Sequence, residues 1–238
     1  RIDGIAGIIN GTSNYILTQM RDAGLDFATA LADAQRLGYA EADPSFDIDG
    51  VDAAHKLSIL AAIAFGMPLC FDEVHIEGIR DLSAVDVDYA GQLGYRLKLL
   101  GIARRGADGV QLRVHPTLLP QRHLLAQVDG VINAVLVDSD ALGQSLYYGA
   151  GAGAGPTASA VVADLVDIAR ALTIDAEHRV PYLAFHHDRL QALPVQPIDA
   201  VETAFYLRLT AFDRPGVLAD VTRILADQQI SIEAILQK

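Results

Sequence analysis

A short acidic segment followed by one lysine carries the densest group of reactive side chains in this sequence. Its five carboxylates belong to Glu41, Asp43, Asp47, Asp49 and Asp52, and Lys56 lies one helical turn further on. Carboxylates this close repel one another unless a cation or an ammonium group lies among them. The segment therefore predicts a binding site for a positively charged ligand, such as the ammonium group of an amino acid.

A calcium-binding loop is the first alternative, because residues 47–50 partly match that motif. In this alignment Ser45 takes the first ligand position, and Lys56 replaces the glutamate that must bind calcium through both oxygens. The calcium motif therefore fails at its most demanding position, the glutamate that binds through both oxygens. The scattered histidines also lack the spacing of metal ligands, so the sequence predicts no metal site.

Asp52 and Lys56 are four residues apart and therefore share one face of a predicted helix. In one interpretation they form a surface ion pair that contributes roughly a few tenths of a kcal/mol. In the other, the carboxylate positions a lysine that exchanges a proton with a substrate at the mouth of an acidic pocket. Leu57, Ile59 and Leu60 lie next to the lysine in sequence, which predicts partial desolvation and favours proton transfer.

Three helices are expected to hold this segment, since apolar residues recur at intervals of three and four. They cover residues 12–23, 26–37 and 51–65. Thr12 or Ser13 can cap the first helix, and Gly24 and Gly38 mark the ends of the first two.

The middle of the chain changes to short β-branched and aromatic segments that are typical of strands. They cover Tyr95–Ala103, Val110–His115, Ile132–Val137 and Gln144–Tyr148. A long helix with an apolar stripe is expected from Pro156 to about Leu172. The sequence therefore predicts an α+β fold in which helices pack on a largely antiparallel or mixed sheet.

Alternating glycine and alanine residues precede that long helix. Gly149, Gly151 and Ala154 satisfy a permissive dinucleotide-binding pattern, but neither a parallel βαβ unit nor a later acidic residue supports it. A flexible turn is a second interpretation. In a third, the glycines let the backbone approach a ligand, and Pro156 at the first helical position leaves N–H groups directed at an anion.

Proline residues between Val180 and Pro197 predict a linker to a small C-terminal unit. That unit is expected to contain a strand over 204–212, a turn at 213–216, a helix over 217–228 and a strand over 230–236. Such a βαβ piece is too short to bury a core alone, so another protomer or further chain must complete it.

Composition argues against several classes of function. The 238-residue chain has 30 acidic and 18 basic residues and a formal net charge of -12, which disfavours a nucleic-acid partner. The longest apolar run, residues 57–65, is too short to cross a membrane. The single cysteine, Cys70, favours a reducing cytoplasm over secretion. Because the chain opens within structured sequence and without an initiator Met, we expect it to be part of a longer protein.

Three long runs of the chain closely resemble homoserine dehydrogenase. They are Gly7–Leu17, Ala34–Pro44 and Asp47–Leu57. This family interconverts L-homoserine and L-aspartate 4-semialdehyde with NAD or NADP, on the route to threonine, methionine and isoleucine. The resemblance therefore implies an oxidoreductase of amino-acid biosynthesis.

The resemblance also implies roles for particular residues. Lys56 would act with Asp52 as the general acid and base at the substrate oxygen. Glu41 and Asp52 would bind the amino group and the hydroxyl of homoserine. The residues that would line the rest of the substrate site are Asp47, Gly38 and Tyr39. Those that would contact the cofactor are Gly11, Thr12, Gly151, Ala152 and Gly153.

The run Asp213–Leu218 resembles the start of an ACT domain, an amino-acid-binding module with a ferredoxin-like fold. The implied division is a substrate-binding and dimerisation domain over residues 1–196 and a partial ACT regulatory domain over 200–238, in a homo-oligomeric dimer or tetramer with threonine as effector. In this family a Rossmann domain and a loop for a monovalent cation precede the region that is matched here. The alternative function is a non-catalytic amino-acid-binding regulatory and dimerisation module.

Overall fold

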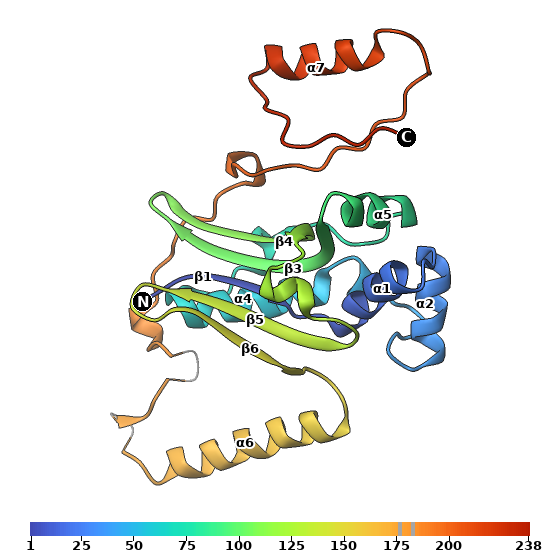
Figure 1. Cartoon of the computed structure of the whole chain (residues 1–238). Helices are drawn as coiled ribbons and strands as arrows, with labels where there is room; N and C mark the ends of the chain where they lie inside the picture. Colours follow the sequence, from blue (N-terminus) through green and yellow to red (C-terminus); the bar gives the residue numbers. More distant parts are fainter. Residues whose placement is uncertain (176–177, 182–183) are drawn as a thin grey trace.

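A six-stranded mixed sheet with the order β2-β4-β3-β1-β5-β6 forms the centre of the protein (Figure 1). The computed structural model describes residues 1–175, 178–181 and 184–238. The strands are β1 (Ile2–Ile8), β2 (His75–Ile76), β3 (Tyr95–Gly106), β4 (Gly109–Pro120), β5 (Ile132–Ser139) and β6 (Gly143–Ala150). Neighbouring strands are antiparallel except β2 and β4, which run parallel. The predicted α+β class is confirmed.

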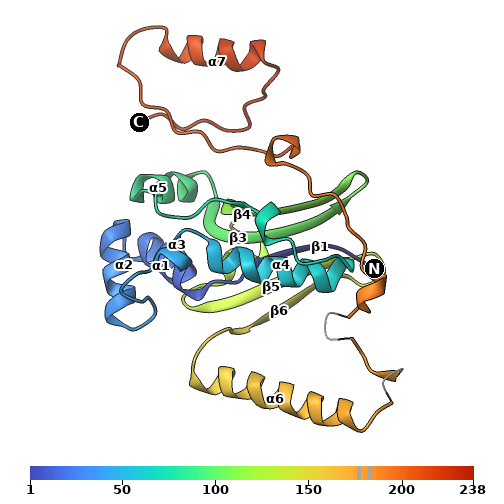
Figure 2. The same cartoon turned by 180° about the vertical axis from the view of Figure 1, so that it is seen from behind.

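Helices cover one face of the sheet, as the view from behind shows (Figure 2). The helices are α1 (Gly11–Asp22), α2 (Phe27–Arg36), α3 (Ser45–Ile48), α4 (Val51–Phe65), α5 (Ala84–Gln92), α6 (Ala154–Leu172) and α7 (Val217–Asp227). The main core lies beneath α1 and α4, where Ile16 and Leu57 belong to one cluster with Ala103 of β3. On the opposite face a smaller cluster joins Leu125 with Ile8 of β1.

The three helices expected around the acidic segment form close to their predicted positions. Asn10, rather than Thr12 or Ser13, caps α1, because its side-chain oxygen accepts the Ser13 N–H at 2.8 Å. Asp26 caps α2 in the same way. The α4 helix spans 51–65 as predicted.

The central strand β1 was not predicted from the sequence. Gly4 and Gly7 interrupt its apolar residues, so it lacks the alternation that marks the other strands. It is nevertheless paired on both edges, since Ile5 lies opposite Ala103 of β3 and Val137 of β5. Hydrogen bonding on both sides makes the end of β1 a rigid base for the residues that follow it.

The C-terminal segment differs most from expectation. The α7 helix forms, but residues 204–212 and 230–236 form no strand. A strand requires regular backbone hydrogen bonds to a neighbouring strand, and these segments form none within the described residues. Figure 1 shows the segment as a loop above the sheet, with α7 at its far side.

The α6 helix stands away from the sheet in both views (Figures 1 and 2). None of its residues is buried, and Val161, Leu165 and Ile168 of its predicted apolar stripe are exposed. The linker expected over 180–197 includes residues 182–183, which lie outside the described part of the chain. Beyond them Val195 forms an isolated bridge with Val110 of β4. Among the described helices, none combines the length and the apolar character needed to cross a membrane.

A buried lysine ties the sheet to the loop before β5. Lys98 of β3 is only 1% exposed. Its ammonium donates to Asn14 Oδ1 at 3.0 Å and to Asp129 Oδ1 at 2.9 Å. It also donates to the Val128 carbonyl oxygen, and Arg21 donates to Asp129 Oδ1 at 2.8 Å. Burial raises the pKa of Asp129, but hydrogen bonds from Arg21 and Lys98 outweigh burial and lower that pKa to about 2.

Replacing Asp129 by Asn is expected to lower the free energy of unfolding by about 2 kcal/mol, because the buried Lys98 ammonium then keeps only neutral acceptors. The matched control is Asp22→Asn, which removes an exposed partner of the same Arg21 and should change stability by less than about 0.5 kcal/mol. Urea unfolding near neutral pH measures both. Equal losses in the two variants would contradict this account of the lysine cluster.

The stabilisation from Asp129 should also depend on pH. Its folded-state pKa of about 2 lies below the usual value, so the stabilisation is complete above a pH of about 4 and is lost as the pH falls toward 2. The stability difference between the wild type and Asp129→Asn should therefore shrink on acidification. Urea midpoints at a series of acidic pH values test this, and a constant difference would show that the carboxylate charge is not responsible.

Candidate active site

The acidic segment folds around the junction between β1 and α1. Gly38, with a φ of 77°, follows the end of α2, and Gly50, with a φ of 84°, leads from α3 into α4. Both glycines adopt the left-handed conformation that other residues avoid. These turns bring Asp47 of α3 and the first turn of α4 to Asn10 at the start of α1.

Asn10, Asp47, Asp52 and Lys56 form one hydrogen-bonded network. The Asn10 amide nitrogen donates to Asp47 Oδ1 at 2.7 Å and to Asp52 Oδ2 at 2.9 Å. Lys56 Nζ donates to the same Asp52 Oδ2 at 2.7 Å and to the Ile9 carbonyl oxygen at 3.1 Å. The pairing of Asp52 with Lys56 that the sequence predicted is present, and Asn10 adds Asp47 to it.

The lysine of this pair reaches solvent while its partner is largely covered. The Lys56 side chain is 48% exposed and the Asp52 side chain 19%, so the lysine is partly desolvated, as the sequence predicted. Two of the three ammonium N–H groups have acceptors, and the third has none within the described residues. An amine held by a carboxylate and open to a ligand can give or accept a proton at a substrate oxygen.

The loop after α2 brings Tyr39 to the first turn of α1. Thr12 Oγ1 donates to the Tyr39 carbonyl oxygen at 2.7 Å, which links a predicted cofactor-side residue to a predicted substrate-side residue. The Glu41 side chain is exposed and makes no hydrogen bond within the described residues. The structure therefore brings Thr12 and Tyr39 together but does not join Glu41 to the carboxylate–lysine pair.

Gly11 and Gly151 approach the start of β5 from two sides. A Cβ atom at Gly11 would lie 2.8 Å from the Val131 carbonyl oxygen, and one at Gly151 would overlap the Asn133 amide nitrogen. The Asn133 amide oxygen is buried and has no hydrogen-bond partner within the described residues. Glycine at these two positions therefore lets the chain pack closely on Val131 and Asn133, and it leaves one buried acceptor of Asn133 unpaired within the described residues.

The glycine turn enters α6 differently from the sequence-based expectation. Ala152 precedes Gly153, which has a φ of 114° and caps the helix, so α6 begins at Ala154. Pro156 is therefore the third helical residue and not the first. Because proline lacks an N–H group and the Thr157 N–H is bonded to the Gly153 carbonyl oxygen at 3.0 Å, fewer donors than predicted face an anion.

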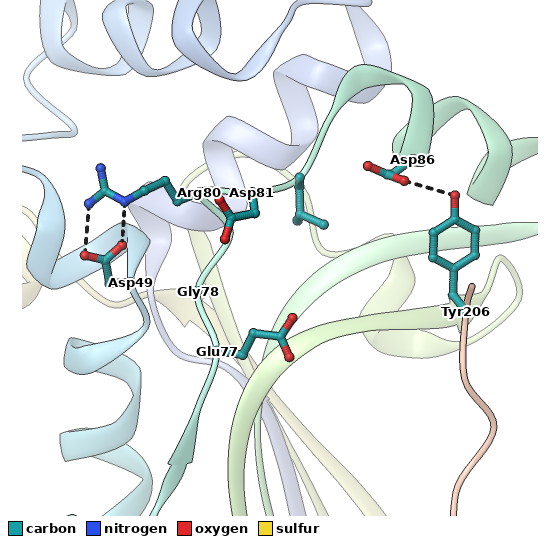
Figure 3. Close-up of a pocket in the computed structure, with 8 residues that line it drawn as sticks. Asp49, Glu77, Gly78, Arg80, Asp81, Asp86 and Tyr206 are labelled. Atoms are coloured by element: carbon teal, nitrogen blue, oxygen red, sulfur yellow. Dashed lines mark hydrogen bonds and ion pairs between the residues drawn. The ribbon is translucent and has the colours of Figure 1, made fainter. Parts of the chain in front are cut away.

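An arginine neutralises another carboxylate of the acidic segment. Arg80 donates to both oxygens of Asp49, each at 2.9 Å (Figure 3). The pair borders a cavity of about 440 Å³ that is also lined by Asp86 of α5 and Tyr206 of the C-terminal segment. The cavity contains neither member of the carboxylate–lysine pair.

Sequence reasoning singled out neither Asn10 nor Arg80 as part of the site. A polar residue between an apolar strand and a helix is a cap signal, and that signal could have found Asn10. Arg80 lies 31 residues from Asp49, and no spacing rule connects them. Within the described residues, no group of three or more His, Cys, Asp or Glu side chains is arranged to hold a metal ion.

These features place the chain among α+β units that carry a carboxylate–lysine pair beside a glycine-lined surface. The family model for homoserine dehydrogenase matches residues 1–166, and the model for the ACT domain matches residues 205–238. The chain belongs to the homoserine dehydrogenase family.

Similar proteins agree with this assignment. The homoserine dehydrogenase of Pseudomonas aeruginosa is 60% identical over 238 residues, which are 100% of this chain and 55% of that protein. A solved homoserine dehydrogenase from Thiobacillus denitrificans has a TM-score of 0.95 and 65% identity, with 100% of this chain and 55% of that chain covered. A hyperthermophilic archaeal homoserine dehydrogenase mutant in complex with NADPH has a TM-score of 0.60 and 30% identity, with 73% and 49% covered. The chain spans about half the length of the curated relatives it matches.

Two helical glycines should respond oppositely to alanine. Gly11→Ala is expected to destabilise the protein by about 1 to 3 kcal/mol, because its Cβ would meet the Val131 backbone oxygen. Gly91→Ala in α5 meets open space, so it should stabilise by about 0.5 kcal/mol through lower unfolded-state entropy. Urea unfolding of both variants tests the close packing at the start of α1. Stabilisation by Gly11→Ala would show that this approach is not tight.

Proposed function

We propose that this chain is the substrate-binding part of a homoserine dehydrogenase, which interconverts L-homoserine and L-aspartate 4-semialdehyde with NADP or NAD. The network of Asn10, Asp47, Asp52 and Lys56 is the observation that carries the proposal. It combines carboxylates for an amino-acid ammonium group with a lysine that can exchange a proton.

The acidic side of the network would bind the substrate. Asp52 and Glu41 receive the amino group and the hydroxyl of homoserine, and Asp47 lies against the same amide as Asp52. Gly38 and Tyr39 form the loop that closes over the start of α1. A pocket of this charge favours an amino acid over an alcohol that lacks the ammonium group.

Lys56 would exchange the proton that accompanies hydride transfer. In the direction of aldehyde reduction, its ammonium group donates a proton to the substrate oxygen as the alcohol forms. In the direction of oxidation, the neutral amine takes the hydroxyl proton as the carbonyl forms. Asp52 holds Nζ at 2.7 Å and so keeps the amine directed at one position.

The cofactor supplies hydride donation or acceptance when it is bound. Gly11, Thr12, Gly151, Ala152 and Gly153 would contact its nicotinamide end, and most of the nucleotide would be held by a part of the enzyme outside this chain. The unpaired Asn133 oxygen next to Gly151, an acceptor for an N–H group, supports this placement. A similar archaeal homoserine dehydrogenase is described in complex with NADPH, which supports the cofactor class.

The proposal extends to the rest of the chain. Residues 1–196 would form the catalytic domain and residues 200–238 part of an ACT regulatory domain that responds to threonine. The apolar stripe of α6, which is exposed here, would pack on the nucleotide-binding part of the enzyme. The segments at 204–212 and 230–236 would gain strand partners from further ACT sequence in a cytoplasmic homo-oligomer.

Lys56→Ala in a full-length enzyme that contains this chain is expected to lower kcat for homoserine oxidation by about 10³-fold, because general acid–base catalysis contributes about 10²- to 10⁴-fold. The rate of homoserine-dependent reduction of NADP or NAD measures this loss, and it is followed by the absorbance of the reduced cofactor at roughly 340 nm. The variant should fold normally, since the Lys56 side chain is half exposed.

The matched control is Lys238→Ala, which removes a different lysine–carboxylate pair, with Asp88, that shares no residue with the network. It should keep kcat within about twofold. Full activity of Lys56→Ala would remove the lysine from the mechanism. A wild-type enzyme that binds threonine but turns over no homoserine with either cofactor would favour the non-catalytic regulatory module.

A further inference from the structure

Asn10 lies at the centre of the carboxylate network and is only 6% exposed. It lies two residues after the central strand β1 and caps α1, so regular structure on both sides holds its position. Every polar atom of its side chain is used: the oxygen accepts one N–H, and the nitrogen donates to two carboxylates.

The orientation of the Asn10 amide follows from its partners. The Ser13 backbone N–H, at 2.8 Å, is a donor and needs the amide oxygen. The Asp47 and Asp52 oxygens are acceptors and need the amide nitrogen. A flipped amide would place its oxygen against two carboxylates, so only one orientation is compatible with the network.

Two carboxylates held by one amide group have a fixed separation. Without the shared donor, the like charges of Asp47 and Asp52 would push the side chains apart. The Ser13 hydroxyl also donates to the Asp47 carbonyl oxygen at 3.0 Å, so α3 is bound to the first turn of α1 through backbone and side chain together. Lys56 occupies the same Asp52 oxygen as Asn10, which leaves Asp52 Oδ1 for a ligand.

We propose that Asn10 is a positioning residue that determines specificity for a substrate with an ammonium group. It holds Asp47 beside Asp52, one of the two carboxylates that receive the substrate, so that an ammonium group at Asp52 meets both negative charges. A hydroxy acid without the amino group leaves these charges uncompensated. The inference rests on the proposed function and adds to it the origin of the selectivity for an amino acid.

Helix capping alone does not require asparagine at this position. Serine and aspartate cap helices about as well as asparagine, but neither has the two amide hydrogens that Asp47 and Asp52 accept. The variants Asn10→Ser and Asn10→Asp therefore separate the cap from the positioning of the carboxylates. Asn10→Asp in addition places a third negative charge between the first two.

The experiment uses a full-length enzyme that contains this chain. For the wild type and each variant, thermal unfolding, kcat and KM for homoserine, and KM for the cofactor are measured. The ratio of kcat/KM for homoserine to that for 4-hydroxybutyrate, the same molecule without the amino group, reports the selectivity. Asn14→Ser is the control, because it removes an amide of α1 that is 2% exposed and bonds to Val128 and Ile132 instead of to carboxylates.

Asn10→Ser should raise KM for homoserine about tenfold and lower the selectivity ratio about tenfold, with the melting temperature and the cofactor KM nearly unchanged. At neutral pH, Asn10→Asp should raise KM for homoserine further and lower the selectivity ratio further than Asn10→Ser does. Asn14→Ser should lower the melting temperature but keep the selectivity ratio.

Two results would overturn the inference while the proposed function stands. One is an active wild type whose Asn10→Ser variant keeps the full selectivity ratio, which would leave Asn10 as a helix cap only. The other is a parallel change in Asn10→Ser and Asn14→Ser, in which stability and selectivity fall and both KM values rise alike, which would show a purely structural role. A wild type that does not oxidise homoserine would overturn the proposed function, and the inference with it.

Discussion

The folding of the acidic segment depends on one constraint: carboxylates that are brought close together must each face a donor. Arg80 meets Asp49 with two hydrogen bonds, and Lys56 meets Asp52. The Asn10 amide nitrogen donates a further hydrogen bond to Asp52 and one to Asp47. Because Asn10 follows a strand that is paired on both edges, the sheet fixes where these charges can gather. The position of β1 thus fixes Asn10, and Asn10 in turn fixes the positions of Asp47 and Asp52 in the acidic segment.

The other side of the site depends on the charge of Lys98, which has no role in the proposed reaction. The buried ammonium of Lys98 and the amide of Asn14 hold the loop at 128–132 against α1. That loop supplies the Val131 oxygen next to Gly11 and leads to Asn133 next to Gly151. The start of α1 therefore contributes to both walls, with Asn10 at its cap bound to the carboxylates and Gly11 packed on Val131.

Sequence patterns were sufficient where the interaction is local. The 3.6-residue period predicted α4, and the spacing of four residues predicted the contact of Asp52 with Lys56. They were insufficient where the partner is distant, as for Arg80 with Asp49, or where glycine weakens the pattern, as in β1. The segments at 204–212 and 230–236 carry strand-like residues, but a strand forms only with a neighbour, and sequence alone does not supply one.

The C-terminal segment is held to the rest of the chain by charge rather than by apolar packing. Arg208 pairs with Asp86 at 2.6 Å, and Tyr206 donates to the same carboxylate at 3.0 Å. Burial raises the pKa of Asp86, but hydrogen bonds from Ser83 and Arg208 outweigh burial and lower it to about 2. The carboxylate therefore stays ionised near neutral pH, and this attachment persists there. Tyr206 borders the same cavity as the Asp49–Arg80 pair. The segment that matches the ACT model and the acidic segment therefore both line this one cavity.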